Sequence, residues 1–169
     1  YRRQRQMCIR DRSYVQLSGL EQRINSPQTR DLVRRLNLAA ITVLNNKNHI
    51  LPLHTDKEQT IALLEVGDPG ETDALAKQLS RYTSLARFSL RANQTKEENQ
   101  RLRDSLSTYK RIIVAVSEQR LAPYQPFFAK FVPESPAIYL FFTPGKMMLQ
   151  IQRAVAHASA VVLGHSYSS

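Results

Sequence analysis

The chain has 169 residues, of which 42% are hydrophobic and 22% are charged, a composition that is ordinary for a globular domain. This length is enough for one domain with a sizeable core. No hydrophobic run approaches the roughly 18 residues needed to cross a bilayer, so we expect no membrane partner.

Of the net charge of +10, +4 falls within the first twelve residues and +6 on the rest of the chain. Residues 1–12 carry five arginines and one aspartate, and Met7–Arg12 looks like a translated sequencing adapter. We therefore interpret residues 1–12 as a non-native leader and exclude them from the fold; the alternative is a natural basic arm. The only cysteine, Cys8, lies in this leader, so disulfides and cysteine-ligated metals are excluded from the rest of the chain.

Residues 13–25 are polar with scattered hydrophobic residues, and we interpret them as a linker. A helix is predicted to follow, with Ser26 as its N-cap and Pro27 at its first position. Its hydrophobic residues fall at helical spacing, and three arginines lie largely off that stripe: Arg30, Arg34 and Arg35.

The stretch Leu36–Leu53 organises the rest of the chain. It leaves the predicted helix, passes through the short β-branched run Ile41–Leu44 and a polar turn, and closes on Ile50–Leu53. We interpret this stretch as the entry into an α/β domain over residues 26–169 that is incomplete at its C-terminus.

Hydrophobic runs alternate with helical patterns beyond Leu53. The strand-like runs are residues 60–66, 84–90, 111–117, 137–142 and 159–163. The helical patterns are the stripe Leu75, Leu79 and Tyr82, the capping box Thr95–Glu98, the aromatic stripe Tyr124, Phe127, Phe128 and Phe131, and the stripe Met148, Ile151 and Val155.

Three of these runs are nearly continuous, which is typical of parallel strands covered by helices on both faces. The predicted fold is therefore a three-layer α/β/α sandwich with a mostly parallel sheet of five or six strands in a flavodoxin-like order. Any ligand is expected at the carboxyl ends of the strands, near Gly67–Asp68 and near Ser117–Glu118.

The sequence contains no pattern that would hold a cofactor. Gly67–Gly70 follows a strand but fails the dinucleotide fingerprint, and Pro69 removes a backbone donor that a phosphate would need. Gly145–Lys146 lacks the upstream glycine of a P-loop. The histidines lack metal-ligand spacing, so we predict no metal site from His49, His54, His157 and His165.

Two residues are weak catalytic candidates. Ser166 lies in Gly164–Ser168, directly after the last strand, and nearly matches the G-x-S-x-G nucleophile elbow of α/β-hydrolases, although its fifth position is Ser168 rather than glycine. Glu118 follows a strand and could serve as a general acid. The simpler interpretation is a plain loop at Ser166 and a solvated glutamate at Glu118.

The remaining basic residues are dispersed, without aromatic interleaving or a known nucleic-acid motif, so we expect no nucleic-acid partner. A basic binding module without catalysis nevertheless stays open as an alternative function, beside an α/β-hydrolase fragment that uses Ser166.

The stretch Leu36–Leu53 resembles the start of the C-terminal α/β domain of family 3 glycoside hydrolases. In that family a helix leads into a run of the form S-x-x-L-L-K-N-x-x-x-x-L-P-L, followed by a strand of the type I-A-L/V-I/L-G. Here Ala40–Asn46, Ile50–Leu53 and Ile61–Leu64 match in order and spacing. Residues 159–164 also look like the family's penultimate strand, and the bacterial β-N-acetylhexosaminidase-like members are the most similar.

The resemblance implies a non-catalytic domain of a β-glycosidase that acts on β-N-acetylhexosaminides or β-glucosides. The family's nucleophilic aspartate lies on a TIM barrel, which would be the partner domain in the same polypeptide and which this chain lacks. The basic helix and the Asn45–His49 turn are our predicted contacts with that barrel. In β-glucosidase-like members a glutamate of this domain acts as the acid; Glu118 lies near the corresponding region, but the surrounding motif is missing.

Overall fold

The computed structural model describes residues 18–54, 59–67 and 69–164, and the chain divides into two compact units at Leu38 and Ala39. Before this division lie helix α2 (Leu20–Ile24) and most of helix α3 (Pro27–Ala40). The predicted cap of α3 is confirmed, because the backbone N–H of Thr29 donates to Ser26 Oγ at 3.2 Å. Helix α2 lies inside the segment interpreted as a linker and was not predicted; the boundary at residue 26 stays a prediction.

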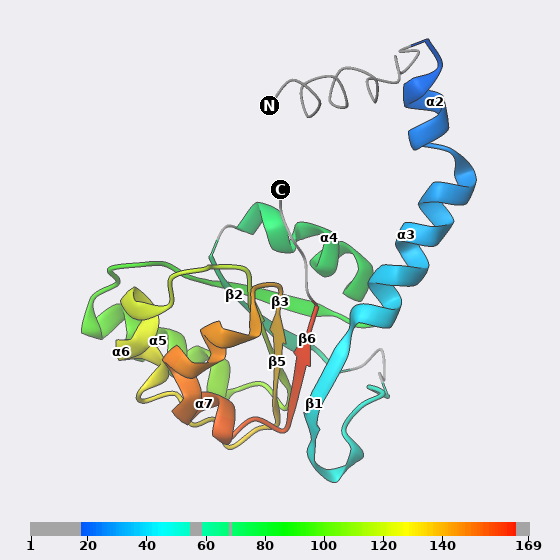
Figure 1. The fold of residues 1–169 in the computed structure, drawn as a ribbon. Coiled ribbons are helices and arrows are strands. Elements are labelled where there is room, and N and C mark those ends of the chain that lie inside the picture. Colours follow the sequence, from blue (N-terminus) through cyan, green and yellow to red (C-terminus); the bar gives the residue numbers. More distant parts are fainter. Residues whose placement is uncertain (1–17, 55–58, 68, 165–169) are drawn as a thin grey trace, which may run out of the picture. The chain divides into compact units, whose positions relative to one another are not determined.

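The larger unit is built on a six-stranded sheet in the order β1-β6-β5-β4-β2-β3 (Figure 1). Its strands are β1 (Thr42–Asn46), β2 (Ile61–Val66), β3 (Leu85–Leu90), β4 (Ile112–Val116), β5 (Ala137–Phe141) and β6 (Ala160–Leu163). Strands β2 to β6 are parallel, and their order is the predicted flavodoxin-like one. The edge strand β1 pairs with β6 in the antiparallel direction, with an irregularity between Val43 and Asn45.

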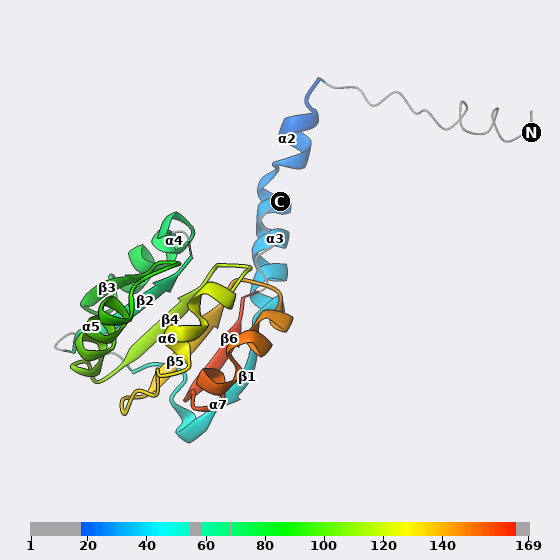
Figure 2. The same ribbon diagram turned by 90° about the vertical axis from the view of Figure 1, so that its left-hand side faces the viewer.

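Helices cover both faces of the sheet, which confirms the three-layer sandwich (Figures 1 and 2). Helix α4 (Pro69–Leu79) packs on one face. The opposite face carries α5 (Lys96–Ser107), α6 (Gln125–Phe128) and α7 (Gln152–Ala156). None of the described helices is long and hydrophobic enough to cross a membrane.

Every residue of β2 and β4 is buried. Alternate residues of β2 contribute to two separate cores, Leu64 to the one under α5, α6 and α7, and Leu63 to the one under α4. The continuous hydrophobic runs in the sequence therefore reflect burial on both faces, as predicted.

The aromatic stripe predicted as a helix face is buried, but the helix itself is short. Only the 3-10 turn η2 (Ala122–Tyr124) and the single turn of α6 form there. The ring of Phe127 lies 5.4 Å from that of Phe128 and 5.0 Å from that of Phe131, measured between centroids. Similarly, the stripe at Met148–Val155 divides into the 3-10 helix η3 (Gly145–Ile151) and α7.

The placement of Tyr82 on the stripe of α4 was wrong. The helix ends at Leu79, and Tyr82 lies in the following turn with 63% of its surface exposed. The spacing of seven residues from Leu75 matched a helix period, but the chain leaves the helix before the period is completed.

The capping box of α5 is present as predicted. The backbone N–H of Glu98 donates to Thr95 Oγ1 at 3.1 Å, and the backbone N–H of Thr95 donates to Glu98 Oε2 at 2.8 Å. The bond from the Thr95 backbone lowers the pKa of Glu98. Because this pKa is lowered in the folded chain, the stabilisation exists above the ordinary glutamate pKa and is lost as the pH falls through the lowered value.

We expect Thr95→Ala to lower the free energy of unfolding by about 1 kcal/mol near neutral pH, measured by urea denaturation. The control is Thr60→Ala, which changes an exposed threonine that caps no helix. The difference between the wild-type chain and Glu98→Gln should also shrink as the pH falls below about 4. A Thr95→Ala chain as stable as the control would contradict the capping role.

Candidate functional site

The carboxyl ends of β2 and β4 bring Gly67 against Ser117 and Glu118. Gly67 has a φ of 115°, and a Cβ on it would lie 2.6 Å from Ser117 Oγ and 2.8 Å from the backbone nitrogen of Glu118. The backbone N–H groups of Ser117 and Glu118 both donate to the carbonyl of Val66, at 3.0 and 3.3 Å. The sequence placed Gly67 and Ser117–Glu118 each at the carboxyl end of a strand, and the structure brings these residues into contact.

The Glu118 carboxylate is half-buried and bound to its own loop. Its Oε1 accepts a hydrogen bond from the backbone N–H of Arg120 at 3.0 Å. Burial, and to a lesser extent the negative charge of Glu118, raise the pKa of the Tyr124 phenol. Glu118 is therefore a carboxylate at the carboxyl-end edge of the sheet, held by a short loop, and its catalytic role stays a prediction.

The second catalytic candidate, Ser166, cannot be placed, and Ser117 beside Glu118 is engaged with the backbone. Ser117 is buried, and its hydroxyl donates to the carbonyl of Val66 at 3.3 Å. Ser166 and His165 lie outside the described residues. Among residues 18–54, 59–67 and 69–164 there is no cluster of three or more histidine, cysteine, aspartate or glutamate side chains that could hold a metal ion.

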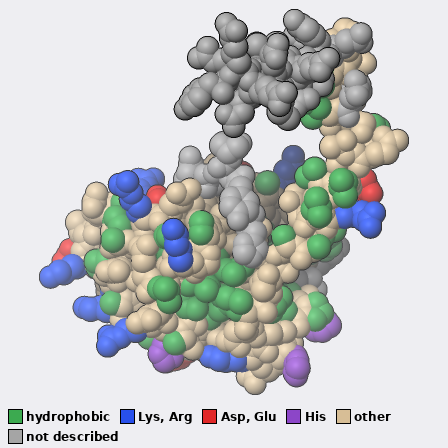
Figure 3. Space-filling model, viewed as in Figure 1, with side chains coloured by type: hydrophobic (Ala, Val, Ile, Leu, Met, Phe, Trp, Pro, Cys, Tyr) green, Lys and Arg blue, Asp and Glu red, His purple; other side chains and the backbone are tan. Residues whose placement is uncertain are grey.

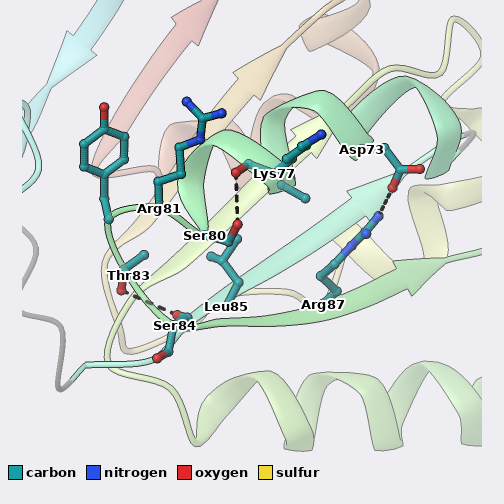
Figure 4. Close-up of a pocket in the computed structure, with 10 residues that line it drawn as sticks. Asp73, Lys77, Ser80, Arg81, Thr83, Ser84, Leu85 and Arg87 are labelled. Atoms are coloured by element: carbon teal, nitrogen blue, oxygen red, sulfur yellow. Dashed lines mark hydrogen bonds and ion pairs between the residues drawn. The ribbon is translucent and has the colours of Figure 1, made fainter.

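A charged cluster that the sequence did not predict lies under α4, and Figure 4 shows two of its members, Arg87 and Asp73. The Glu65 side chain is 4% exposed, and its Oε1 accepts hydrogen bonds from Thr72 Oγ1 at 2.5 Å and from Arg87 Nη2 at 2.8 Å. Arg87 also donates to Glu65 Oε2 at 3.1 Å and pairs with Asp73 at 2.5 Å. The hydrogen bonds to Glu65, and then those to Asp73, raise the pKa of Arg87.

An open hollow of about 760 Å³ lies beside this cluster, between α4 and the start of β3. Its lining includes Lys77, Ser80 and Arg81 as well as Arg87 (Figure 4). The one sequence signal for this region was a glutamate inside an otherwise hydrophobic strand run, since such a carboxylate needs a cationic partner.

The polar turn within Leu36–Leu53 is tied to the domain by its own side chains. Asn46 closes the loop, since its Oδ1 accepts from the Leu51 backbone N–H at 2.9 Å and its Nδ2 donates to the Leu51 carbonyl at 3.0 Å. Lys47 Nζ donates to the Ala156 carbonyl at 2.9 Å, beside α7. Within the predicted barrel contact Asn45–His49, the side chains of Asn48 and His49 are exposed, and their contact with a barrel stays a prediction.

No family model matches the chain, and no curated protein matches it by sequence. Solved structures do match. A fungal multi-domain GH3 β-N-acetylglucosaminidase is similar with a TM-score of 0.64 and 12% identity, over 85% of this chain and 16% of its own. A β-glucosidase from Listeria innocua, solved with glucose, is similar with a TM-score of 0.58 and 16% identity, over 82% of this chain and 23% of its own. The β-glucoside phosphorylase BglX is similar with a TM-score of 0.65 and 15% identity, over 96% of this chain and 31% of its own.

The described chain has the fold of the C-terminal α/β domain of family 3 glycoside hydrolases. The resemblance stated from Leu36–Leu53 is thereby confirmed at the level of the fold. The chain spans only 16% to 31% of the length of these three solved structures.

We expect Gly67→Ala to destabilise the domain by about 1–3 kcal/mol, because the new methyl group would meet the backbone of Glu118 and because φ is positive there. Gly19→Ala is the matched control: it carries a φ of 76° but meets nothing within 4 Å. Urea denaturation of both variants separates the steric clash from the backbone strain. Equal losses in the two variants would contradict the close approach at Gly67.

We expect Arg87→Met to lower the free energy of unfolding by about 1–3 kcal/mol, because it leaves the buried Glu65 carboxylate without its cationic partner. Arg81→Met is the control, since this exposed arginine lines the same hollow. Thermal and urea unfolding measure the stability of both variants. If the Arg87→Met chain is as stable as the Arg81→Met chain, the Glu65 carboxylate does not need Arg87, and the expectation is wrong.

Proposed function

We propose that this chain belongs to family 3 glycoside hydrolases and forms the non-catalytic C-terminal α/β domain of a β-glycosidase. The observation that carries the proposal is the likeness of fold, with TM-scores of 0.58 to 0.65 over 82% to 96% of the chain, to parts of enzymes named for β-glucosides or β-N-acetylglucosaminides. The match at Leu36–Leu53 supports it independently, because it comes from the sequence. The proposed substrate of the whole enzyme is a β-N-acetylhexosaminide or a β-glucoside.

The proposed partner is the catalytic TIM barrel of the same polypeptide. A row of hydrophobic side chains crosses β5, β6 and β1 in register, with Leu140 opposite Val162 and Val162 opposite Val43. Leu140 and Val162 are half-buried, and 51% of Val43 is exposed. Hydrophobic side chains also gather in the middle of the side seen in Figure 3. Such partly covered hydrophobic surface is what a domain interface within one chain uses.

The chemistry of the reaction supports a non-catalytic role for this domain. Retaining hydrolysis needs two carboxyl groups about 5 Å apart, one as nucleophile and one as acid. The predicted edge of the sheet offers the Glu118 carboxylate, which already accepts a bond from its own loop. We infer that the nucleophile and the acid both come from the barrel, and that this domain shapes the rim of the active site.

We expect the isolated chain to show no turnover of an aryl β-N-acetylglucosaminide or an aryl β-glucoside above background, while the chain joined to its barrel hydrolyses one of them. In that full-length enzyme, Glu118→Gln should change kcat less than about threefold, because a lost general acid would reduce it by about 10²–10⁴-fold. Glu134→Gln, an exposed glutamate after α6, is the control. Turnover by the isolated chain, or a loss of that larger size, would overturn the non-catalytic assignment.

A further inference from the structure

Helix α3 is amphipathic, and its hydrophobic side is exposed. Leu36 stands four residues from Leu32 and three from Val33, so these three side chains share one side of the helix, which we call the α3 stripe. They are 59%, 54% and 49% exposed, and no residue of α3 is buried. A helix of 14 residues is marginal in water without packing. The α3 stripe is therefore surface that a partner is needed to cover.

Arginines border the α3 stripe on both sides. Arg35 stands three residues from Leu32, and Arg30 stands three residues from Val33, which places one arginine along each border. Both arginines are exposed, and neither forms an ion pair with another described residue. At the rim of a hydrophobic contact, such cations are complemented by carboxylates of the partner. The two borders therefore favour a partner surface with an acidic rim.

The opposite side of α3 lacks such a stripe. Arg34 and Leu38 each stand two residues from Leu36, which turns them about 200° around the helix axis. Leu38 is 60% exposed, almost the same as Leu36. Its neighbours three and four residues earlier are Arg35 and Arg34, so this leucine stands alone among charged side chains. Two equally exposed leucines thus differ only in whether they belong to a hydrophobic stripe.

The charge of the chain argues against a second copy as the occupant. The net charge is +10, and two α3 helices packed stripe to stripe would bring their arginine borders together. A lipid surface also fits poorly, because the stripe has three large hydrophobic side chains and no aromatic one. A groove in a protein, hydrophobic along its floor and acidic along its rim, fits both the stripe and its borders.

We propose that the α3 stripe docks into such a groove on the catalytic barrel. The three hydrophobic side chains lie on the floor of the groove, and carboxylates of the barrel pair with Arg30 and Arg35 at its rim. Arg34 and Leu38 stay on the solvent side. This inference rests on the proposed function for the identity of the partner domain. It adds which side of α3 faces that domain and the chemistry of the surface that receives it.

Thiol labelling tests the docking, because Cys8 is the only cysteine of this chain. In a Cys8→Ser background, Leu36→Cys and Leu38→Cys place single thiols on the two sides of α3. The rate at which iodoacetamide alkylates each thiol is measured by mass spectrometry of the peptide that holds it, in this chain and in the chain joined to its barrel. We expect rates within about twofold of each other in this chain. In the joined chain, Leu36→Cys should react at least about tenfold more slowly than Leu38→Cys.

Charge reversal tests the acidic rim. In the joined chain, Arg35→Glu should raise the alkylation rate of Leu36→Cys at least about threefold, because carboxylates would then face carboxylates. Arg34→Glu, which reverses an equal charge on the opposite side of α3, should leave that rate unchanged. Val33→Cys supplies a second thiol on the stripe and should be protected in the joined chain as Leu36→Cys is.

The proposal is overturned if neither stripe thiol is protected in the joined chain, or if Arg35→Glu and Arg34→Glu change the rate equally. Protection of Leu36→Cys in this chain alone that rises with protein concentration would overturn it in favour of a second copy. Protection that appears only with vesicles of anionic phospholipid would overturn it in favour of a lipid surface. Labelling does not depend on hydrolysis, so a joined chain that is inactive but protected at Leu36→Cys would refute the proposed activity and keep the docking.

Discussion

Burial of β2 and β4 on both faces is the constraint on which the rest of the domain depends. Each residue of these strands must find a partner in one of the two cores, and this requires helices above and below the sheet. The exception is Glu65, which is 3% exposed in the middle of β2. Its charge is tolerated because Thr72 and Arg87 donate to it, so a polar cluster replaces hydrophobic packing at one point under α4.

Much of the fold could be predicted because the two-sided burial is visible in the sequence. The run of Ile112–Val116 has no polar position, and the capping box at Thr95 depends only on residues three apart. The shortness of α6 could not be predicted, because the spacing of Phe127, Phe128 and Phe131 suits one helical turn followed by an irregular turn as well as a longer helix. The antiparallel direction of β1 was equally hidden, since it depends on pairing with β6, more than a hundred residues away.

The candidate sites also differ in how far they could be predicted from the sequence. The meeting of Gly67 with Ser117 and Glu118 was predictable, because adjacent parallel strands end at one edge. The pairing of Glu65 with Arg87 was not, because it depends on the register of β2 against β3.

The antiparallel edge strand β1 has a consequence for the domain on its own. Beyond β1 no strand of the described sheet follows, so its outer backbone groups are a template to which a second chain could add. The irregularity between Val43 and Asn45 interrupts that template, and the side chain of Asn45 is directed to the Ala158 carbonyl. The interruption divides β1 into two short halves, and a divided edge is a poorer template for edge-to-edge pairing between copies of the chain than a continuous one.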